Sequence, residues 1–308
     1  MHPRLFLLLV VMIVITIMFI CIYLRLKVYH TLYSPLRRNV KKEENKQYEE
    51  LFIDTKRHDV YYSNPHLVKN RIHCWHYNRH PGKPVIYYLH GNNTDLHSFR
   101  FMVDVCQLLQ YNMFMIDYRG FGRSSLDYVT QKNIIEDAEA GYTFLQRRYQ
   151  SDKIVIWGIS LGSNPALNLA CQHPVHALIL LSPYSSIHHM FNDFSLPKSL
   201  IAEPLKVLTS ELNKQTTNTR LVKKIKCKTI LIHSVDDVVV PYRHSKMLYN
   251  KMNTHVEKKL IGIKGPHDGP VFAPSQFKEL LKFIDSPIHD IESIEKILEK
   301  VHGITPNL

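Results

Sequence analysis

The pentapeptide Gly158-Ile159-Ser160-Leu161-Gly162 decides the fold prediction for this chain of 308 residues. It follows a short apolar run at 154–157 and precedes a helical pattern at 164–171. At such a strand-to-helix turn, G-x-S-x-G holds its serine in a strained, exposed conformation beside a helix N-terminus that favours negative charge. The pattern therefore predicts Ser160 as an acyl-transfer nucleophile, with an ordinary helix-cap serine as the alternative.

Apolar segments alternate with helical patterns on both sides of the pentapeptide. Strand-like segments lie at 49–54, 71–77, 84–90, 113–117, 153–158, 177–182, 229–233 and 258–263. Helical patterns lie at 95–110, 130–149, 165–171, 245–251 and 274–283. This alternation predicts an α/β domain in which helices cover both faces of a mostly parallel sheet.

The stretch between Ser182 and Thr229 is longer than an ordinary crossover connection. It carries apolar residues at irregular helical spacing, which predicts a small helical lid over about residues 185–225. The alternative is a longer surface helix with no role in substrate choice.

A serine nucleophile in this architecture needs an acid and a base, in the chain order Ser, Asp, His. Asp236 and Asp237 directly follow the predicted strand at 229–233, and His267 follows the next strand in a glycine-containing loop. We predict His267 as the general base and Asp237 as the acid that orients it, with Asp236 as the alternative acid.

The oxyanion of the reaction needs backbone donors beside the serine. One is predicted to be the N–H of Leu161, the residue after the nucleophile. The other is predicted to be the main-chain N–H of Asn92, in the loop that follows the strand at 84–90.

The N-terminal part of the chain has a different character. Residues 5–24 (LFLLLVVMIVITIMFICIYL) form an uncharged run that is long enough to cross a bilayer as a helix. A cleaved signal peptide, the alternative, would have a shorter apolar core followed by small residues. We therefore predict a membrane anchor over residues 1–30, a basic stalk over 31–47 and the catalytic domain over 48–308.

Charge around the run sets its orientation. Basic residues are concentrated after it, at Arg25, Lys27, Arg37, Arg38, Lys41 and Lys42. The positive-inside rule therefore predicts a catalytic domain that faces the cytosol. The net charge of +12 comes without any nucleic-acid-binding motif, so the expected partner of Arg37, Arg38, Lys41 and Lys42 is an anionic membrane surface.

Cofactor and metal patterns are weak in this sequence. Gly120-Phe121-Gly122 begins like a dinucleotide-binding motif but lacks the third glycine. The five cysteines are scattered and no H-E-x-x-H occurs. We predict neither a cofactor nor a metal.

Four segments in this order resemble a known family: 89–93 (LHGNN), 117–124 (DYRGFGRS), 158–162 (GISLG) and 236–241 (DDVVVP). Over about residues 48–283 the chain resembles the α/β-hydrolase superfamily, and within it the serine hydrolases similar to α/β-hydrolase-domain proteins 12, 13 and 17. The resemblance implies an α/β-hydrolase fold with the roles given above for Ser160, Asp237, His267, Asn92 and Leu161. Two departures from the family pattern are Ser234, where a glycine is common, and Pro266 before the histidine.

The resulting hypothesis is a membrane-anchored serine hydrolase that cleaves acyl esters or thioesters, as a lipid esterase or a protein depalmitoylase does. Its expected partners are an acyl-lipid or an S-acylated protein. One alternative is a serine aminopeptidase, which would need lid carboxylates for a free amine; the lid offers few, namely Asp193, Glu203 and Glu211. Another is a membrane-tethered interaction module without catalysis, which would predict a damaged triad.

Overall fold

The computed structural model describes residues 33–37, 47–55, 70–127, 129–193, 217–288 and 290–302, together with the single positions 12, 16, 19 and 23. Apart from these single positions, the anchor predicted over residues 5–24 lies outside the described residues, as do residues 194–216 of the predicted lid. In the part that is described, no helix combines the length and the apolar character needed to cross a membrane.

Eight strands form one sheet, in the order β1-β2-β4-β3-β5-β6-β7-β8. Their bounds are β1 Glu49–Asp54, β2 Arg71–Tyr77, β3 Val85–Leu89, β4 Asn112–Ile116, β5 Ile154–Ile159, β6 Ala177–Leu181, β7 Lys228–Ser234 and β8 Lys258–Ile263. β2 pairs antiparallel with both β1 and β4, and all other neighbours pair in parallel. The mostly parallel sheet is therefore confirmed, and each strand lies within one residue of its predicted bounds.

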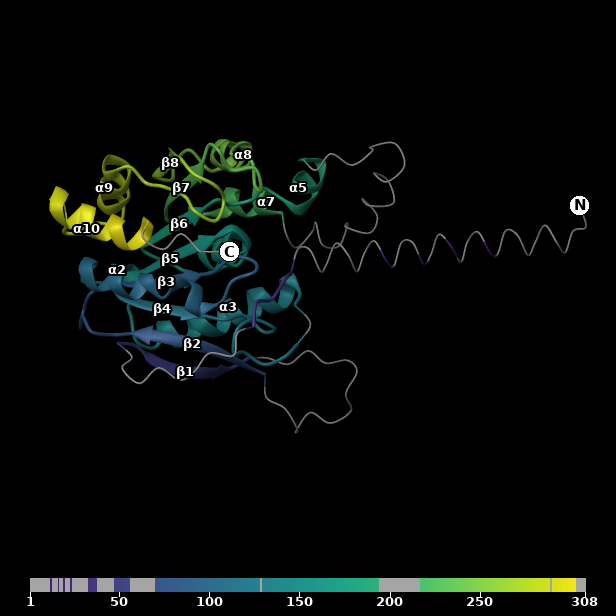
Figure 1. The fold of residues 1–308 in the computed structure, drawn as a ribbon, viewed down its shortest axis with the longest axis horizontal. Coiled ribbons are helices and arrows are strands. Elements are labelled where there is room, and N and C mark those ends of the chain that lie inside the picture. Colours follow the sequence, from purple (N-terminus) through teal and green to yellow (C-terminus); the bar gives the residue numbers. More distant parts are fainter. Residues whose placement is uncertain are drawn as a thin grey trace, which may run out of the picture.

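Helices cover the sheet on both faces because its inner strands are apolar on both sides. One core cluster joins the strands to α2 Phe101–Leu109, α9 Pro274–Phe283 and α10 Ile291–His302, which lie side by side in Figure 1. The other joins them to α3 Gln131–Gln146, α4 Ser163–Gln172, α7 Asn218–Leu221 and α8 Arg243–Lys251. Along β5, Ile156 packs into one cluster and Trp157 into the other.

Local sequence explains the helix boundaries. The helix predicted at 95–110 is divided into a 3-10 turn, η1 Leu96–Phe99, and α2. Asp95 is the N-cap of η1, and its Oδ1 accepts from Ser98 N at 3.0 Å in a capping box. α3 begins after Thr130, whose hydroxyl oxygen accepts from Asn133 N at 3.1 Å.

Residues 33–37, which we call the strap, pack against the domain although they lie in the predicted stalk. Tyr33 is only 5% exposed and belongs to the core cluster of α3 and α4. The Nη1 of Arg37 donates to the carbonyl oxygens of Gly120 at 3.3 Å and Ser124 at 3.0 Å. Arg37 is therefore engaged by the protein, whereas the other basic residues expected at a membrane surface (Arg38, Lys41 and Lys42) lie outside the described residues.

Candidate active site

The elbow, residues 158–162, is built by close backbone packing. Ser160 has a φ of 49°, which strains a non-glycine residue at the end of β5. A β-carbon on Gly158 would lie 2.5 Å from the carbonyl oxygen of Gly162. A β-carbon on Gly162 would lie 2.1 Å from the carbonyl oxygen of Leu89, so both outer positions require glycine.

Three predicted site residues from distant parts of the chain meet at this elbow. His267 Nε2 lies 3.0 Å from Ser160 Oγ, and His267 Nδ1 lies 2.6 Å from Asp237 Oδ2. Asp237 follows β7 and His267 follows β8, so the parallel sheet brings their loops to the same edge as the elbow. This arrangement has the geometry of a nucleophile, a general base and the acid that orients the base.

Asp236 and Asp237 have different environments, which separates the two candidate acids. Asp237 is buried, whereas Asp236 is exposed and its Oδ2 accepts from the backbone N–H of Gly265 at 3.2 Å. His267 is bonded to Asp237. In the described part of the chain, only Asp237 therefore has the position of an orienting acid.

Asp237 is held as a carboxylate by several donors. The backbone N–H groups of Val239 and Val240 donate to Oδ1 at 2.9 and 2.8 Å. Burial raises the pKa of Asp237, but hydrogen bonds from His233 and His267 outweigh burial and hold that pKa below its usual value. Asp237 therefore stays ionised and can stabilise a positively charged imidazole on His267.

His233 is a part of this site that the sequence analysis missed. Its Nε2 lies 2.6 Å from the carbonyl oxygen of Val240 and 3.2 Å from Asp237 Oδ2. Its Nδ1 lies 2.6 Å from Ser245 Oγ. A proton on Nε2 satisfies both oxygens, while Nδ1 accepts from Ser245. The available signal was a histidine at the end of a buried strand, next to the predicted acid.

The predicted oxyanion donors lie on two segments that touch. A β-carbon on Gly91 would lie 3.6 Å from the β-carbon of Ser160, so the loop of residues 90–93 rests against the elbow. Asn92 in this loop is partly buried, and Leu161 is the first residue after the nucleophile.

The peptide group between Gly91 and Asn92 is fixed by side chains. The carbonyl oxygen of Gly91 accepts from Thr94 Oγ1 at 2.9 Å and lies 2.8 Å from His90 Nδ1. Burial lowers the pKa of His90, so this ring is neutral and its Nδ1–H donates to Gly91. Because the peptide is planar, fixing the oxygen of Gly91 also fixes the direction of the Asn92 N–H.

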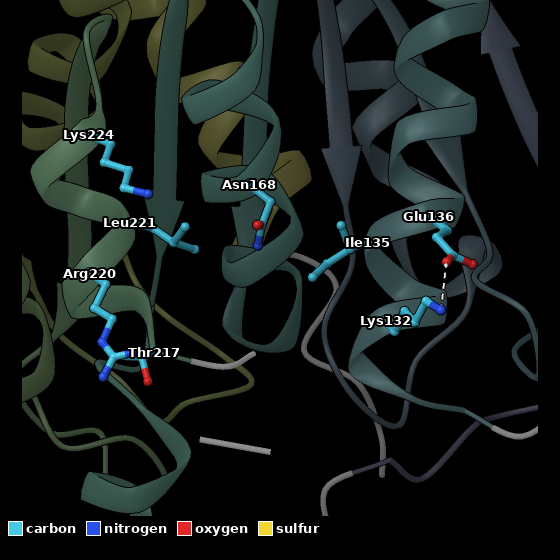
Figure 2. Close-up of a pocket in the computed structure, with 8 residues that line it drawn as sticks. All are labelled: Lys132, Ile135, Glu136, Asn168, Thr217, Arg220, Leu221 and Lys224. Carbon is cyan, nitrogen blue, oxygen red and sulfur yellow. Dashed lines mark ion pairs between the residues drawn. The ribbon is translucent and has the colours of Figure 1, made fainter. Parts of the chain in front are cut away.

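A cavity of about 520 Å³ lies between α3, α4 and α7, away from these residues (Figure 2). Lys132 stands on one wall, Arg220 and Lys224 on the other, and Asn168 of α4 lies between them. None of the predicted site residues lines it. Within the described ranges, no group of three or more His, Cys, Asp or Glu side chains could hold a metal ion.

Comparisons with known proteins show the fold of this chain and several distant relatives. A family model for the alpha/beta hydrolase fold matches residues 84–202. Alpha/beta hydrolase domain-containing protein 17B of Homo sapiens is 29% identical over 218 residues, which cover 69% of this chain and 70% of that protein. Alpha/beta hydrolase domain-containing protein aho-3 of Caenorhabditis elegans is 28% identical over 222 residues, which cover 70% of this chain and 62% of that protein.

Two further similarities concern a lipase and an esterase. Lysophosphatidylserine lipase ABHD12 of Gallus gallus is 34% identical over 185 residues, which cover 54% of this chain and 47% of that protein. An esterase of Pyrococcus furiosus has the same fold, with a TM-score of 0.59 at 19% identity over 85% of this chain and 98% of that chain. Together with the sheet order and the elbow, these similarities show that the chain has the α/β-hydrolase fold and is distantly related to α/β-hydrolase-domain proteins.

Proposed function

We propose that this α/β hydrolase is a serine hydrolase that cleaves acyl esters or thioesters through an acyl-enzyme on Ser160. The observation that carries the proposal is the hydrogen-bonded series from Ser160 Oγ through His267 to Asp237, with distances of 3.0 and 2.6 Å. These are the distances at which a base can take a proton from a hydroxyl while an acid holds the base in orientation.

Acylation is the first half of the reaction. Ser160 Oγ attacks the carbonyl carbon of the substrate while His267 Nε2 takes the hydroxyl proton. The negative charge that develops on the carbonyl oxygen is stabilised by the N–H groups of Asn92 and Leu161. His267 then gives its proton to the leaving alcohol or thiol, which leaves the acyl group on Ser160.

Deacylation repeats these steps with water as the nucleophile. His267 takes a proton from water, which attacks the acyl-enzyme, and the same two N–H groups stabilise the second oxyanion. The carboxylic acid product then leaves, and His267 returns the proton to Ser160 Oγ. Throughout, Asp237 holds the Nδ1–H tautomer of His267 and stabilises its protonated form.

The substrate class we propose is an acyl-lipid or an S-acylated protein, met at a membrane surface. Support comes from the uncharged run at 5–24, and from the relative in Gallus gallus that is named as a lysophosphatidylserine lipase. In this proposal the run anchors the chain and the catalytic domain faces the cytosol. A protease-protection assay on intact vesicles tests the orientation, since a lumenal domain would resist added protease.

Labelling with a fluorophosphonate tests the nucleophile in the full chain. We expect stoichiometric labelling of the wild type and none of Ser160→Ala. Equal labelling of both proteins, or no labelling of the wild type, would contradict the proposal. His255→Gln, a change at an exposed position outside the site, serves as the folded control.

Matched acyl substrates test the reaction class. The full chain in detergent is given oxygen esters and thioesters that share one acyl chain, together with an N-terminal peptide amide. Ser160-dependent hydrolysis of either acyl substrate supports the proposal. Hydrolysis of the peptide amide alone would favour the aminopeptidase alternative.

A further inference from the structure

The strap makes direct contact with the loop that carries the predicted oxyanion donor. Ser34 N–H donates to Asn92 Oδ1 at 2.8 Å, and Ser34 C=O accepts from the backbone N–H of Asn93 at 3.0 Å. One residue of the strap therefore holds two consecutive residues of the loop of residues 90–93, which we call the oxyanion loop after its predicted role. Asn93 has a φ of 52°, in the left-handed region that asparagine adopts more readily than most non-glycine residues.

The strap is itself fixed at both of its ends. At one end Tyr33 is buried in the core, and its hydroxyl donates to Gln131 Oε1 at 3.3 Å. At the other, Leu36 C=O accepts from Gly122 N at 2.8 Å, and Arg37 Nη1 bonds to the carbonyl oxygens of Gly120 and Ser124. Ser34 is thus held between the start of α3 and the loop that follows β4.

These contacts hold the backbone on both sides of Asn92. Thr94 and His90 hold the carbonyl oxygen of Gly91 on one side of Asn92, and Ser34 holds the side chain of Asn92 and the N–H of Asn93 on the other. An oxyanion donor acts only if its N–H lies within hydrogen-bond distance of the developing charge. A displacement of about 1 Å can cost up to a hundredfold in rate.

We propose that the strap positions the main-chain N–H of Asn92 for oxyanion stabilisation, with Tyr33 and Arg37 as its anchors. The inference rests on the proposed serine hydrolase function. In this proposal the strap, which lies in the predicted stalk, contributes to the geometry of the active site. The strap residues act through Asn92, so they are positioning residues and touch no reacting atom.

Substitution of both anchors tests the proposal in the full chain, with a soluble short-chain p-nitrophenyl ester as the probe. The variant is Tyr33→Ala with Arg37→Ala, and kcat is expressed per site labelled by fluorophosphonate. Since oxyanion donors act mainly in the transition state, we expect kcat to fall about tenfold while KM stays within about twofold. A merely structural loss would lower the labelled fraction and leave kcat per labelled site unchanged.

Two variants act as matched controls. Arg148→Ala removes another exposed arginine, which lies just beyond the end of α3. Like Arg37, Arg148 donates through its Nη1 to a backbone carbonyl, here that of Phe144 at 3.0 Å. It should leave kcat within about twofold of wild type. Tyr33→Phe keeps the buried ring and loses only the hydroxyl. When it replaces Tyr33→Ala in the double variant, we expect it to restore most of the lost kcat.

The outcomes separate this inference from the function on which it rests. A wild type without Ser160-dependent hydrolysis overturns the proposed function and the inference with it. A wild type that is active, with an unchanged kcat per labelled site in the anchor variant, overturns the role of the strap alone. An equal loss of kcat in Arg148→Ala also overturns it, because the effect would then not depend on the oxyanion loop.

Discussion

Gly162 packs directly against the main chain of Leu89. A β-carbon at Gly162 would lie 2.1 Å from the carbonyl oxygen of Leu89 and 2.7 Å from that of His90. Leu89 ends β3, which pairs in parallel with β4 on one side and β5 on the other. Because this backbone is held on both sides, the contact fixes the spacing between the elbow and the oxyanion loop.

Gly162→Ala is therefore expected to damage both stability and activity. The added methyl group must push β3 away from the elbow, an overpacking strain of about 1–3 kcal/mol or more. We expect a lower melting temperature and at least a tenfold loss of kcat on an acyl ester. Gly91→Ala is the steric control, since its β-carbon would meet Ser160 Cβ at an ordinary 3.6 Å and should leave the melting temperature nearly unchanged. Equal melting temperatures for both variants would contradict the packing argument.

The neighbouring aspartates give a second prediction. Asp237→Asn removes the carboxylate that holds His267 Nδ1 at 2.6 Å, and loss of an orienting acid of this kind lowers kcat by about 10⁴. Asp236→Asn keeps the oxygen that accepts from Gly265 and should change kcat by less than about threefold. Steady-state hydrolysis of one acyl ester by both variants decides between them. A larger loss in Asp236→Asn would assign the acid to Asp236.

The sheet could be predicted from the sequence because a strand that is buried on both faces is almost entirely apolar. The segment at 84–90 is almost entirely apolar, and the structure places β3 there with every residue buried. The elbow was also predictable, since its two glycines are required by backbone contacts and not only by turn geometry. The order of Ser160, Asp237 and His267 along the chain placed all three at one sheet edge in the prediction, and the structure brings them within hydrogen-bonding distance.

The strap and His233 could not be predicted in the same way. Ser34 binds the oxyanion loop through its own N–H and C=O groups, and every residue except proline carries both, so the contact leaves no pattern in the sequence. His233 looks like one polar residue in a buried strand. Only the turn after β7 brings Asp237 back to within 3.2 Å of it.

Acid sensitivity of the fold is a third prediction, carried by His244. This residue is buried, and its Nδ1 accepts from the backbone N–H of Ser185 at 3.1 Å, which a protonated Nδ1 cannot do. Burial lowers the pKa of His244 to about 4, with the charges of Arg243 and His189 adding to the effect. The unfolded chain takes up the proton near pH 6.5, so stability is lost as pH falls from about 6.5 to 4.

Melting temperatures at pH 7 and pH 5 measure this contribution. We expect His244→Gln to have a smaller decrease between the two than wild type, by about 1–2 kcal/mol or a few degrees. Replacing the exposed His255 by glutamine should leave the wild-type decrease intact. An identical decrease in His244→Gln and wild type would exclude His244 as a source of the acid sensitivity.

Arg119 gives the fourth prediction, because it neutralises a carboxylate that has no access to water. The side chains of Arg119 and Asp137 are 1% and 0% exposed, and Arg119 Nε donates to Asp137 Oδ1 at 2.7 Å. Arg119 N–H donates to the other carboxylate oxygen, also at 2.7 Å. Burial raises the pKa of Asp137, and the charge and hydrogen bonds of Arg119 oppose that rise.

Arg119→Met should therefore destabilise the fold by a few kcal/mol, since it leaves a buried carboxylate without its partner. The deficit also depends on pH. Without Arg119 the folded-state pKa of Asp137 rises further above its unfolded value, so the protonated folded form is favoured at low pH and stability is lost as pH rises. We expect the difference in melting temperature between wild type and Arg119→Met to be larger at pH 9 than at pH 5. The double variant Arg119→Met with Asp137→Leu should lose this pH dependence, because no buried carboxylate remains at position 137. If the difference were constant with pH, the lost packing of the arginine, and not its charge, would explain the destabilisation.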